Sequence, residues 1–362
     1  MKIVLGADLV PFKESEKLFV NGDIEKLFGD VLPILKGADR LIVNLECALT
    51  TFDGAITKCG PNLKADPACA DTLVKLGVTD VMLSNNHTFD FGTVGLRDTM
   101  KHLDRVGLPY TGVGENDTDS RKIYYFEQGG KKFGIVNVCE HEYSYALSNR
   151  LGTNPYDPYL TMHDIREAKK NADIVIVIYH GGKEYCRYPS PRLRLLCHEM
   201  VECGADVVLT QHSHCIGCYE EYEGGQILYG QGNFHFAMPS GQEGWFTSLI
   251  VELDIGDTIK WNFYPIRLNI EECEVRLAKG EDAEEIMSAF YARNEELKNG
   301  KWMEGWHAFC ESMPNYRNAL TTVYKPDSTE RQNQIFAHYL DCEAHTDVWR
   351  ELFKTWHHTN EC

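Results

Sequence analysis

The segment DIVIVIYH, residues 173–180, decides the fold class of this chain. Five consecutive β-branched residues, Ile174 to Ile178, stand between Asp173 and Tyr179. The run lacks the alternation of a half-exposed strand and is typical of a strand buried on both faces. Strands of this kind occur in sheets that are covered by helices on both sides. The segment therefore predicts an α/β fold with helical crossovers.

Other segments of the first 270 residues have the same nearly continuous aliphatic character. They are KIVLGAD (2–8), RLIVNLE (40–46), DVMLSNN (80–86), FGIVNVC (133–139) and DVVLTQH (206–212). Residues 92–106 and 190–203 lie between such segments and end before Gly107 and Gly204, so they predict crossover helices. Residues 226–253 predict two more strands, which we expect to be antiparallel and to complete a second sheet.

Polar side chains of one chemical kind stand where these strands end. They are Asp8, Glu46, Asn86, His87, His180, His212 and His214. Ligands of open α/β sheets bind in the crevice outside the carboxyl ends of the strands, so we expect these residues to converge. Carboxylate, amide and imidazole groups together suit the binding of one or two divalent metal ions.

The character of the chain changes after about residue 275, where the sequence is helical and charged. Trp302, Trp306, Trp349 and Trp356 lie in this region, and we expect them to supply core rather than a sugar-binding platform. We predict a domain at residues 1–272 and a helical extension at 273–362 that forms either a cap or a surface for homo-oligomers.

Composition restricts the function classes. The formal net charge of −18 argues against sequence-independent binding to nucleic acid, which requires clustered Lys and Arg. The 13 cysteines are scattered, so we expect them to be reduced. The opening MKIVLGADLV lacks the features of a secretory signal, and no segment is apolar enough for a membrane span. We therefore expect a cytoplasmic protein.

The motif NNHTFDFG (85–92) places an amide beside an imidazole at a strand end. Asn86 could ligate a metal ion, His87 could protonate a leaving group, and Asp90 could hold His87 in the useful tautomer. A structural turn rich in Asn, with Asp as a capping residue, would have the same sequence.

The motif QHSH (211–214) lets two imidazoles reach one face of a turn. Imidazole is a common ligand for zinc, manganese and iron. A single histidine is usually structural, but His180 and Glu46 end two other strands. We therefore predict a metal centre.

These motifs resemble those of the CapA family, which is associated with capsule and poly-γ-glutamate synthesis. The matching stretches are NLECALT (44–50), SNNHTFDFG (84–92), YHGGKEY (179–185), GADVVLTQHSH (204–214) and ILYGQGNFHF (227–236). The family is similar to the calcineurin-like metallophosphoesterases, so the resemblance implies a four-layer α-β-β-α sandwich over residues 1–255. It leaves the last hundred residues without an assignment.

The resemblance also implies a role for each residue of the site. Glu46 would bridge two metal ions. Asn86, His180 and His212 would complete one metal site, Asp8 and His214 would hold the other, and His87 would be the general acid, oriented by Asp90.

The chain departs from the superfamily pattern in the first motif, which usually reads Asp, any residue, His. Here Val10 stands two residues after Asp8, so the first site lacks one ligand. The bridging residue is Glu rather than the commoner Asp. A mononuclear or metal-free centre therefore stays open.

Several other residues are secondary candidates. We expect Lys58, Glu184, Tyr185 and Arg187 to contact substrate, and Asn44 and Asn233 to orient metal ligands. Cys215 and Cys218 have the C-x-x-C spacing of metal or redox sites, although coincidence is the better explanation in a chain with so many cysteines.

The main prediction is a metal-dependent hydrolase that acts with zinc, manganese or iron on a phosphoester or a γ-glutamyl-type amide. One alternative is a protein that binds a peptide or a polymer in capsule synthesis without turnover. Another is a metal-independent epimerase or lyase that uses His and carboxylate groups.

Overall fold

The computed structural model describes residues 1–354 and contains two large β-sheets. The first sheet has eight strands in the order β18-β17-β16-β1-β2-β5-β6, and β15 also pairs with β1. Its strands are β1 (Lys2–Val10), β2 (Arg40–Leu45), β5 (Asp80–Met82), β6 (Tyr110–Thr111), β15 (Asn233–Phe236), β16 (Thr247–Ile255), β17 (Ile259–Asn269) and β18 (Glu274–Leu277). β1, β2, β5 and β6 are parallel, whereas β16, β17 and β18 add an antiparallel edge.

The second sheet has six strands in the order β13-β14-β12-β11-β9-β8. They are β8 (Tyr124–Gln128), β9 (Lys131–Cys139), β11 (Ile174–His180), β12 (Val207–Gln211), β13 (Ile216–Tyr222) and β14 (Gly225–Gln231). The central strands β9, β11, β12 and β14 are parallel. Every residue of β11 is buried, as its aliphatic run predicts. Two short pairs lie outside the large sheets: β3 (Ala48–Leu49) with β4 (Lys64–Ala65), and β7 (Val113–Gly114) with β10 (Gly152–Thr153).

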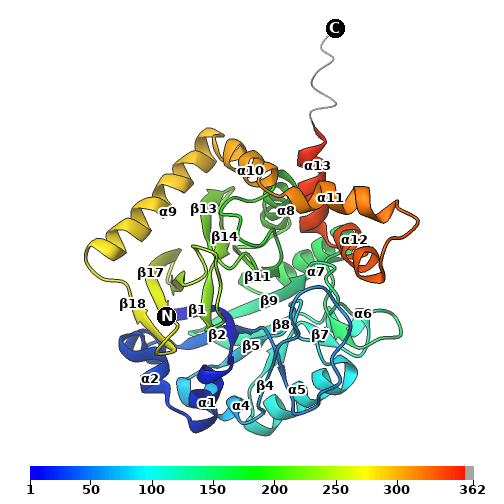
Figure 1. Cartoon of the computed structure of the whole chain (residues 1–362). Helices are drawn as coiled ribbons and strands as arrows, with labels where there is room; N and C mark the ends of the chain where they lie inside the picture. Colours follow the sequence, from blue (N-terminus) through cyan, green and yellow to red (C-terminus); the bar gives the residue numbers. More distant parts are fainter. Residues whose placement is uncertain (355–362) are drawn as a thin grey trace.

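The two sheets face each other across a core of aliphatic side chains. Leu5 and Ile42 from the first sheet belong to the same buried cluster as Ile176 and Leu209 from the second. Helices cover the outer face of each sheet, which gives four layers in the order α-β-β-α (Figure 1). The predicted sandwich is therefore confirmed.

The helices over the first sheet precede residue 107. They are α1 (Glu14–Asn21), α2 (Ile24–Phe28), α3 (Leu32–Lys36), α4 (Cys69–Leu76) and α5 (Gly92–Val106), with the 3-10 turn Gly29–Val31 between α2 and α3. The short helix α6 (Asp117–Ser120) follows. α7 (Pro158–Asn171) and α8 (Pro191–Glu202) cover the second sheet. The crossover helices predicted at 92–106 and 190–203 are both present.

Up to residue 354, five helices follow the last strand: α9 (Glu281–Asn299), α10 (Trp302–Glu311), α11 (Pro314–Val323), α12 (Glu330–Asp341) and α13 (Glu343–Leu352). α9 closes one edge of the sandwich, where Phe290 enters the core between the sheets. The other helices gather beside α8, in orange and red in Figure 1. Trp302 and Trp306 are buried in the core of that layer, and Trp349 packs against it. Trp356 lies outside the described residues.

One prediction about strand pairing was wrong. The segments 227–236 and 247–253 do not form an antiparallel pair in one sheet. β14 pairs with β12 in the second sheet, whereas β16 pairs with β1 in the first. The physical reason is Gly232, whose φ of 86° breaks the first segment, so that β15 leaves the second sheet and joins β1.

The first sheet continues through β18, which pairs with β17. The division of the chain at residues 272 and 273, and oligomers through the C-terminal helices, stay predictions. Among the helices within residues 1–354, none combines the length and the apolar character that crossing a membrane requires.

Candidate metal centre

The predicted ligands come together because they stand at neighbouring strand ends. Asp8 lies near the end of β1, where the pairing shifts register between Asp8 and Leu9. Glu46 directly follows β2, and His180 is the last residue of β11. The two sheets thus present their ligands to a common space between them. Asn86, His87, His212 and His214 come from the loops after β5 and β12.

Glu46 occupies the centre of this group. Its side chain is fully buried, and neither carboxylate oxygen has a hydrogen-bond partner. Burial, and then the negative charge of Asp8, raise the pKa of Glu46 to about 8. Two sets of three residues each bring one possible ligand atom per residue within 4.8 Å of the other two atoms of the set. Glu46 belongs to both sets. One set contains Asp8 and His180, and the other contains His212 and His214.

The shared position of Glu46 agrees with the bridging role that the family resemblance implies. The implied grouping of the remaining ligands stays a prediction, because Asp8 lies close both to His180 and to His214, whose Nδ1 is 3.5 Å from Asp8 Oδ2. Val10, at the place of the missing ligand, is a buried strand residue.

His180 has a polar neighbour at each ring nitrogen. Asn44 Nδ2 is 3.2 Å from Nδ1, and Asn86 Oδ1 is 3.0 Å from Nε2. Glu46 Oε1 lies 3.3 Å from the same Nε2. Burial lowers the pKa of His180 to about 4, so the imidazole is neutral at pH 7. A neutral imidazole is the form that binds metal ions.

A chain of amides fixes the side of the site nearest Asp8. The backbone N–H groups of His87 and Thr88 donate to Asn85 Oδ1, which sets the orientation of that amide. Asn85 Nδ2 donates to Asn44 Oδ1 at 3.0 Å, and Asn44 Nδ2 donates to Asp8 Oδ1 at 2.7 Å. The predicted orienting role of Asn44 agrees with this geometry. Asn85 was absent from the prediction.

His212 and His214 stand in backbone conformations that residues with a β-carbon rarely adopt. Their φ angles are 87° and 52°, and strain of this kind clusters at functional sites. His212 Nδ1 is buried without a hydrogen-bond partner. Burial lowers the pKa of His212 to about 3. The ring is therefore neutral, with one nitrogen left for a ligand bond.

His214 is held by two oxygen atoms. Its Nδ1 lies 2.8 Å from Asn233 Oδ1 and 3.5 Å from Asp8 Oδ2. Burial alone would lower the pKa of His214, but the charges of Glu46 and Asp8 raise it. Asn233 thus contacts a predicted ligand, as an orienting residue would.

His87 lies beside the metal-ligand group, on the wall of a cleft. Its Nδ1 is 2.7 Å from Asp90 Oδ2, which accepts the Nδ1 hydrogen and leaves Nε2 without a hydrogen bond among the described residues. Lys58 Nζ donates to Asp90 Oδ1 at 2.5 Å, and both partners are buried. The geometry agrees with the predicted orientation of His87 by Asp90. It also commits Lys58, a predicted substrate contact, to Asp90.

The cleft beside the metal-ligand group is a cavity of about 360 Å³. Glu184 and Tyr185, two of the predicted substrate contacts, line it together with Lys58. Arg187 does not line it but pairs with Glu243 at 3.5 Å beside other cavities. Met313, Asn315, Tyr316, Ile335, His338, Tyr339 and His345 of the C-terminal helices form much of the wall. The extension therefore covers this cleft.

Sequence reasoning missed Glu142, which joins the C-terminal helices to the metal-ligand group. Its carboxylate lies 3.4 Å from His212 Nε2 and 2.9 Å from His338 Nε2. Burial would raise the pKa of Glu142, but the two imidazoles lower it well below its usual range. A carboxylate behind a metal-binding imidazole is a common support of metal sites. No motif identifies Glu142, because His338 lies 196 residues away.

Cys215 and Cys218 do not point to a redox or metal site. Their thiols donate to the backbone oxygens of Cys186 and Arg187, at 3.5 Å and 3.3 Å. Burial raises the pKa of Cys215 to about 11 and that of Cys218 to about 12. They have the properties of structural cysteines.

The residues present suit a divalent metal ion. A buried carboxylate without hydrogen bonds is costly, and a cation beside it removes that cost. The surrounding oxygen and nitrogen donors match the mixed sites of zinc, manganese and iron.

The family model described as "Bacterial capsule synthesis protein PGA_cap" matches residues 2–238. The capsule biosynthesis protein CapA of Bacillus anthracis is 31% identical over 292 residues, which cover 73% of this chain and 70% of that protein. The PGA biosynthesis protein CapA of Bacillus subtilis (strain 168) is 30% identical over 245 residues, or 66% of this chain and 62% of that protein. A solved structure of a hypothetical protein from Thermus thermophilus aligns with 73% of this chain and 98% of its own, at 16% identity and a TM-score of 0.46.

Proposed function

The chain belongs to the bacterial capsule synthesis family PGA_cap, and on that premise we propose that it is a metal-dependent hydrolase. The observation that carries the proposal is the environment of Glu46. Its two buried oxygens have no hydrogen-bond partner, and three imidazoles and Asp8 supply further donors around it. Without a cation this arrangement is unfavourable, because the acceptor capacity of the carboxylate is unused.

The residues that would hold the metal ions are Asp8, Glu46, Asn86, His180, His212 and His214. A divalent ion bound there would act as a Lewis acid and would lower the pKa of a water molecule bound to it, so that this water could act as a nucleophile at neutral pH. Asn44 would keep Asp8 and His180 in place through its amide. Glu142 would do the same for His212.

His87 is the general acid of the proposed reaction. Asp90 Oδ2 lies 2.7 Å from Nδ1 and orients the imidazole, so that Nε2 is the nitrogen that would carry the transferred proton. The Nε2 hydrogen is then free for transfer to the leaving group. Lys58 holds the other oxygen of Asp90, which keeps the carboxylate in position.

The proposed substrate is a γ-glutamyl-type amide or a phosphoester. The names of the Bacillus relatives refer to capsule and PGA synthesis, and this supports the amide. Lys183, Glu184 and Tyr185 on the cleft wall supply a cation, an anion and a hydroxyl group that could orient a polar polymer or peptide.

The first experiment is elemental analysis of the purified protein, followed by hydrolysis assays with γ-glutamyl amides and phosphoesters. We expect one or two transition-metal ions per chain at the centre around Glu46. Chelator treatment should abolish turnover, and His180→Ala and His212→Ala should each abolish turnover and tight metal binding at this centre. His163→Ala, at an exposed histidine outside the cleft, is the matched control and should change neither.

The alternatives give different results in the same assays. A polymer-binding protein would show affinity for poly-γ-glutamate without turnover in any assay. A metal-independent epimerase or lyase would be indifferent to chelator. Full activity after both histidine substitutions would reject the metal-dependent hydrolase.

A further inference from the structure

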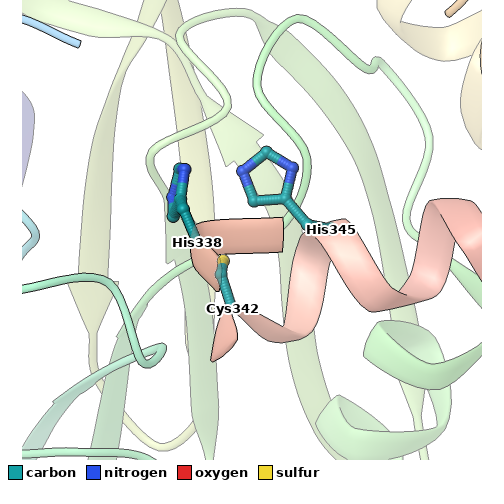
Figure 2. A group of neighbouring side chains, drawn as sticks. All are labelled: His338, Cys342 and His345. Carbon is teal, nitrogen blue, oxygen red and sulfur yellow. The ribbon is translucent and has the colours of Figure 1, made fainter. Parts of the chain in front are cut away.

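Three metal-binding side chains meet at the junction of α12 and α13, outside the group around Glu46. His338, Cys342 and His345 each place a ligand atom within 4.8 Å of the other two. The centroids of the two imidazole rings lie 4.5 Å apart. In the view of Figure 2 the sulfur of Cys342 lies below the two rings, and one nitrogen of His345 points towards His338.

Each imidazole has one nitrogen engaged and one available. His338 Nε2 lies 2.9 Å from Glu142 Oε1, and His345 Nδ1 is hydrogen-bonded to the Tyr316 hydroxyl. Among the described residues, no hydrogen bond engages His338 Nδ1 or His345 Nε2. Metal-bound histidines usually have this arrangement, because a hydrogen bond to one nitrogen orients the other towards the ion.

The surroundings give such an ion a structural purpose. Cys342 is the only residue between α12 and α13, and it caps both helices. α12 contains no buried residue, although it lies over the cleft. Partly buried aromatic rings, such as Tyr339 against Tyr316 and Phe336 against Trp349, hold this helix in place. A bond from each side of the junction to one ion would fix it.

We propose that His338, Cys342 and His345 bind a zinc ion, separate from the metal centre around Glu46. Two imidazoles and a thiolate are typical zinc ligands, and they select against the oxygen-preferring magnesium and calcium. Both histidines line the cavity, which leaves the fourth position to solvent. In the metal-free form the Cys342 thiol donates to Glu140 Oε2 at 3.6 Å, and zinc binding releases this proton.

Cobalt substitution of the full chain tests the proposal, because Cys342 offers a sulfur ligand, whereas the two described ligand sets around Glu46 contain none. We expect the Co²⁺-loaded protein to show sulfur-to-cobalt charge-transfer absorption in the near ultraviolet. Cys342→Ser should remove the band and one equivalent of tightly bound metal. The matched control is Cys310→Ser, a buried cysteine of α10, which should retain both. His212→Asn should also retain the band, since it changes the other centre.

X-ray absorption of the zinc-loaded wild-type chain gives a test without any variant. We expect a sulfur neighbour at about 2.3 Å from part of the bound zinc. Absence of both the sulfur neighbour and the charge-transfer band would overturn the proposal. A band that persists in Cys342→Ser would also overturn it, because the sulfur would then come from another cysteine. If His212→Asn loses metal but keeps the charge-transfer band, the metal has been lost from the proposed hydrolase centre and not from the site at Cys342.

Discussion

Individual side chains of the metal-ligand group have pKa values that differ from their ordinary values, because the fold buries them beside other charged and polar groups. Glu46 lies in a buried space among imidazoles, and neither of its carboxylate oxygens accepts a hydrogen bond. His180 and His212 stay neutral at pH 7 because burial lowers the pKa of each ring. The group therefore combines a carboxylate that needs a cation with neutral imidazoles that can bind one.

The pKa of Glu46 predicts how the stability of the metal-free protein changes with pH. The folded protein keeps this proton up to about pH 8, whereas the unfolded chain releases it near the ordinary value of 4.5. The folded state therefore binds more protons between these values, and stability falls as pH rises. Below about pH 6.5 the lowered histidine pKa values act in the opposite direction.

The effect of Glu46 should therefore be visible between pH 6.5 and pH 8. After chelation, the wild-type chain should lose about 2 kcal/mol of unfolding free energy more than Glu46→Gln across this interval. Urea denaturation of both proteins at the two pH values measures the difference. Equal losses would show that Glu46 is ionised in the metal-free fold.

Glu142 predicts an effect on metal affinity. Glu142→Gln removes the charge behind His212 without removing a metal ligand. We expect a loss of about 10- to 100-fold in affinity, as for other carboxylates that support metal-bound histidines. Calorimetric titration with zinc measures it, with Glu167→Gln, at a half-exposed position of α7, as control. An unchanged affinity at the centre around Glu46 would mean that Glu142 supports only His338.

At the scale of elements, the carboxyl ends of strands from two sheets bring the ligands together. β1 and β2 supply Asp8 and Glu46 from the first sheet, and β11 and β12 lead to His180 and His212 in the second. β15 pairs with β1 on the first sheet and carries Asn233 to His214. Its change of sheet depends on the turn at Gly232.

Gly232 should not tolerate a side chain. Its φ is 86°, and an added β-carbon would lie 2.9 Å from the backbone of Ser248 and of Thr247. We expect Gly232→Ala to cost at least about 2 to 3 kcal/mol of unfolding free energy, from backbone strain and the clash together. Gly224→Ala is the control, because Gly224 has a φ of 84° and nothing within 4 Å. It should cost about 1 kcal/mol. Urea denaturation measures the unfolding free energy of both variants. Equal losses would show that the clash with Ser248 and Thr247 contributes nothing.

At the scale of the whole molecule, the C-terminal helices form part of the cleft rather than a separate appendage. α13 is joined to the second sheet and α8 through Arg192, which contacts Asp347 at 2.9 Å and Glu140 at 2.7 Å. Glu140 also accepts the backbone N–H of Ala344. This buried network connects the extension to the strand β9 that leads into Glu142.

Asp347→Ala should loosen this connection. Asp347 is buried and accepts hydrogen bonds from Arg192 and Ser190. Its removal leaves a mostly buried guanidinium with fewer partners, which typically costs about 3 to 5 kcal/mol. We expect a large fall in the thermal midpoint and faster proteolysis of the C-terminal helices. Asp327→Ala, at an exposed position, should leave both unchanged. If Asp347→Ala also leaves the thermal midpoint and the rate of proteolysis unchanged, the ion network does not hold the C-terminal helices in place.

The sequence by itself determined the α/β sandwich and most of the candidate site. The aliphatic run of 173–180 requires burial on both faces, and the polar residues at strand ends converge because parallel strands share one edge. Local chemistry was enough for Asp8, Glu46, His180, His212 and His214, since each stands directly at or after a strand. Helices 92–106 and 190–203 were readable from periodicity and their glycine stops.

Tertiary structure alone decided the pairing of β14 and β16, the role of Glu142 and the position of the C-terminal helices over the cleft. The physical reason is that each depends on contacts between segments far apart in the chain. Glu142 and His338 carry no periodic signal, and α12 has no buried face to predict its partner. Local patterns determine which residues lie at strand ends or inside helices. Only the packed chain determines which distant side chain completes a site.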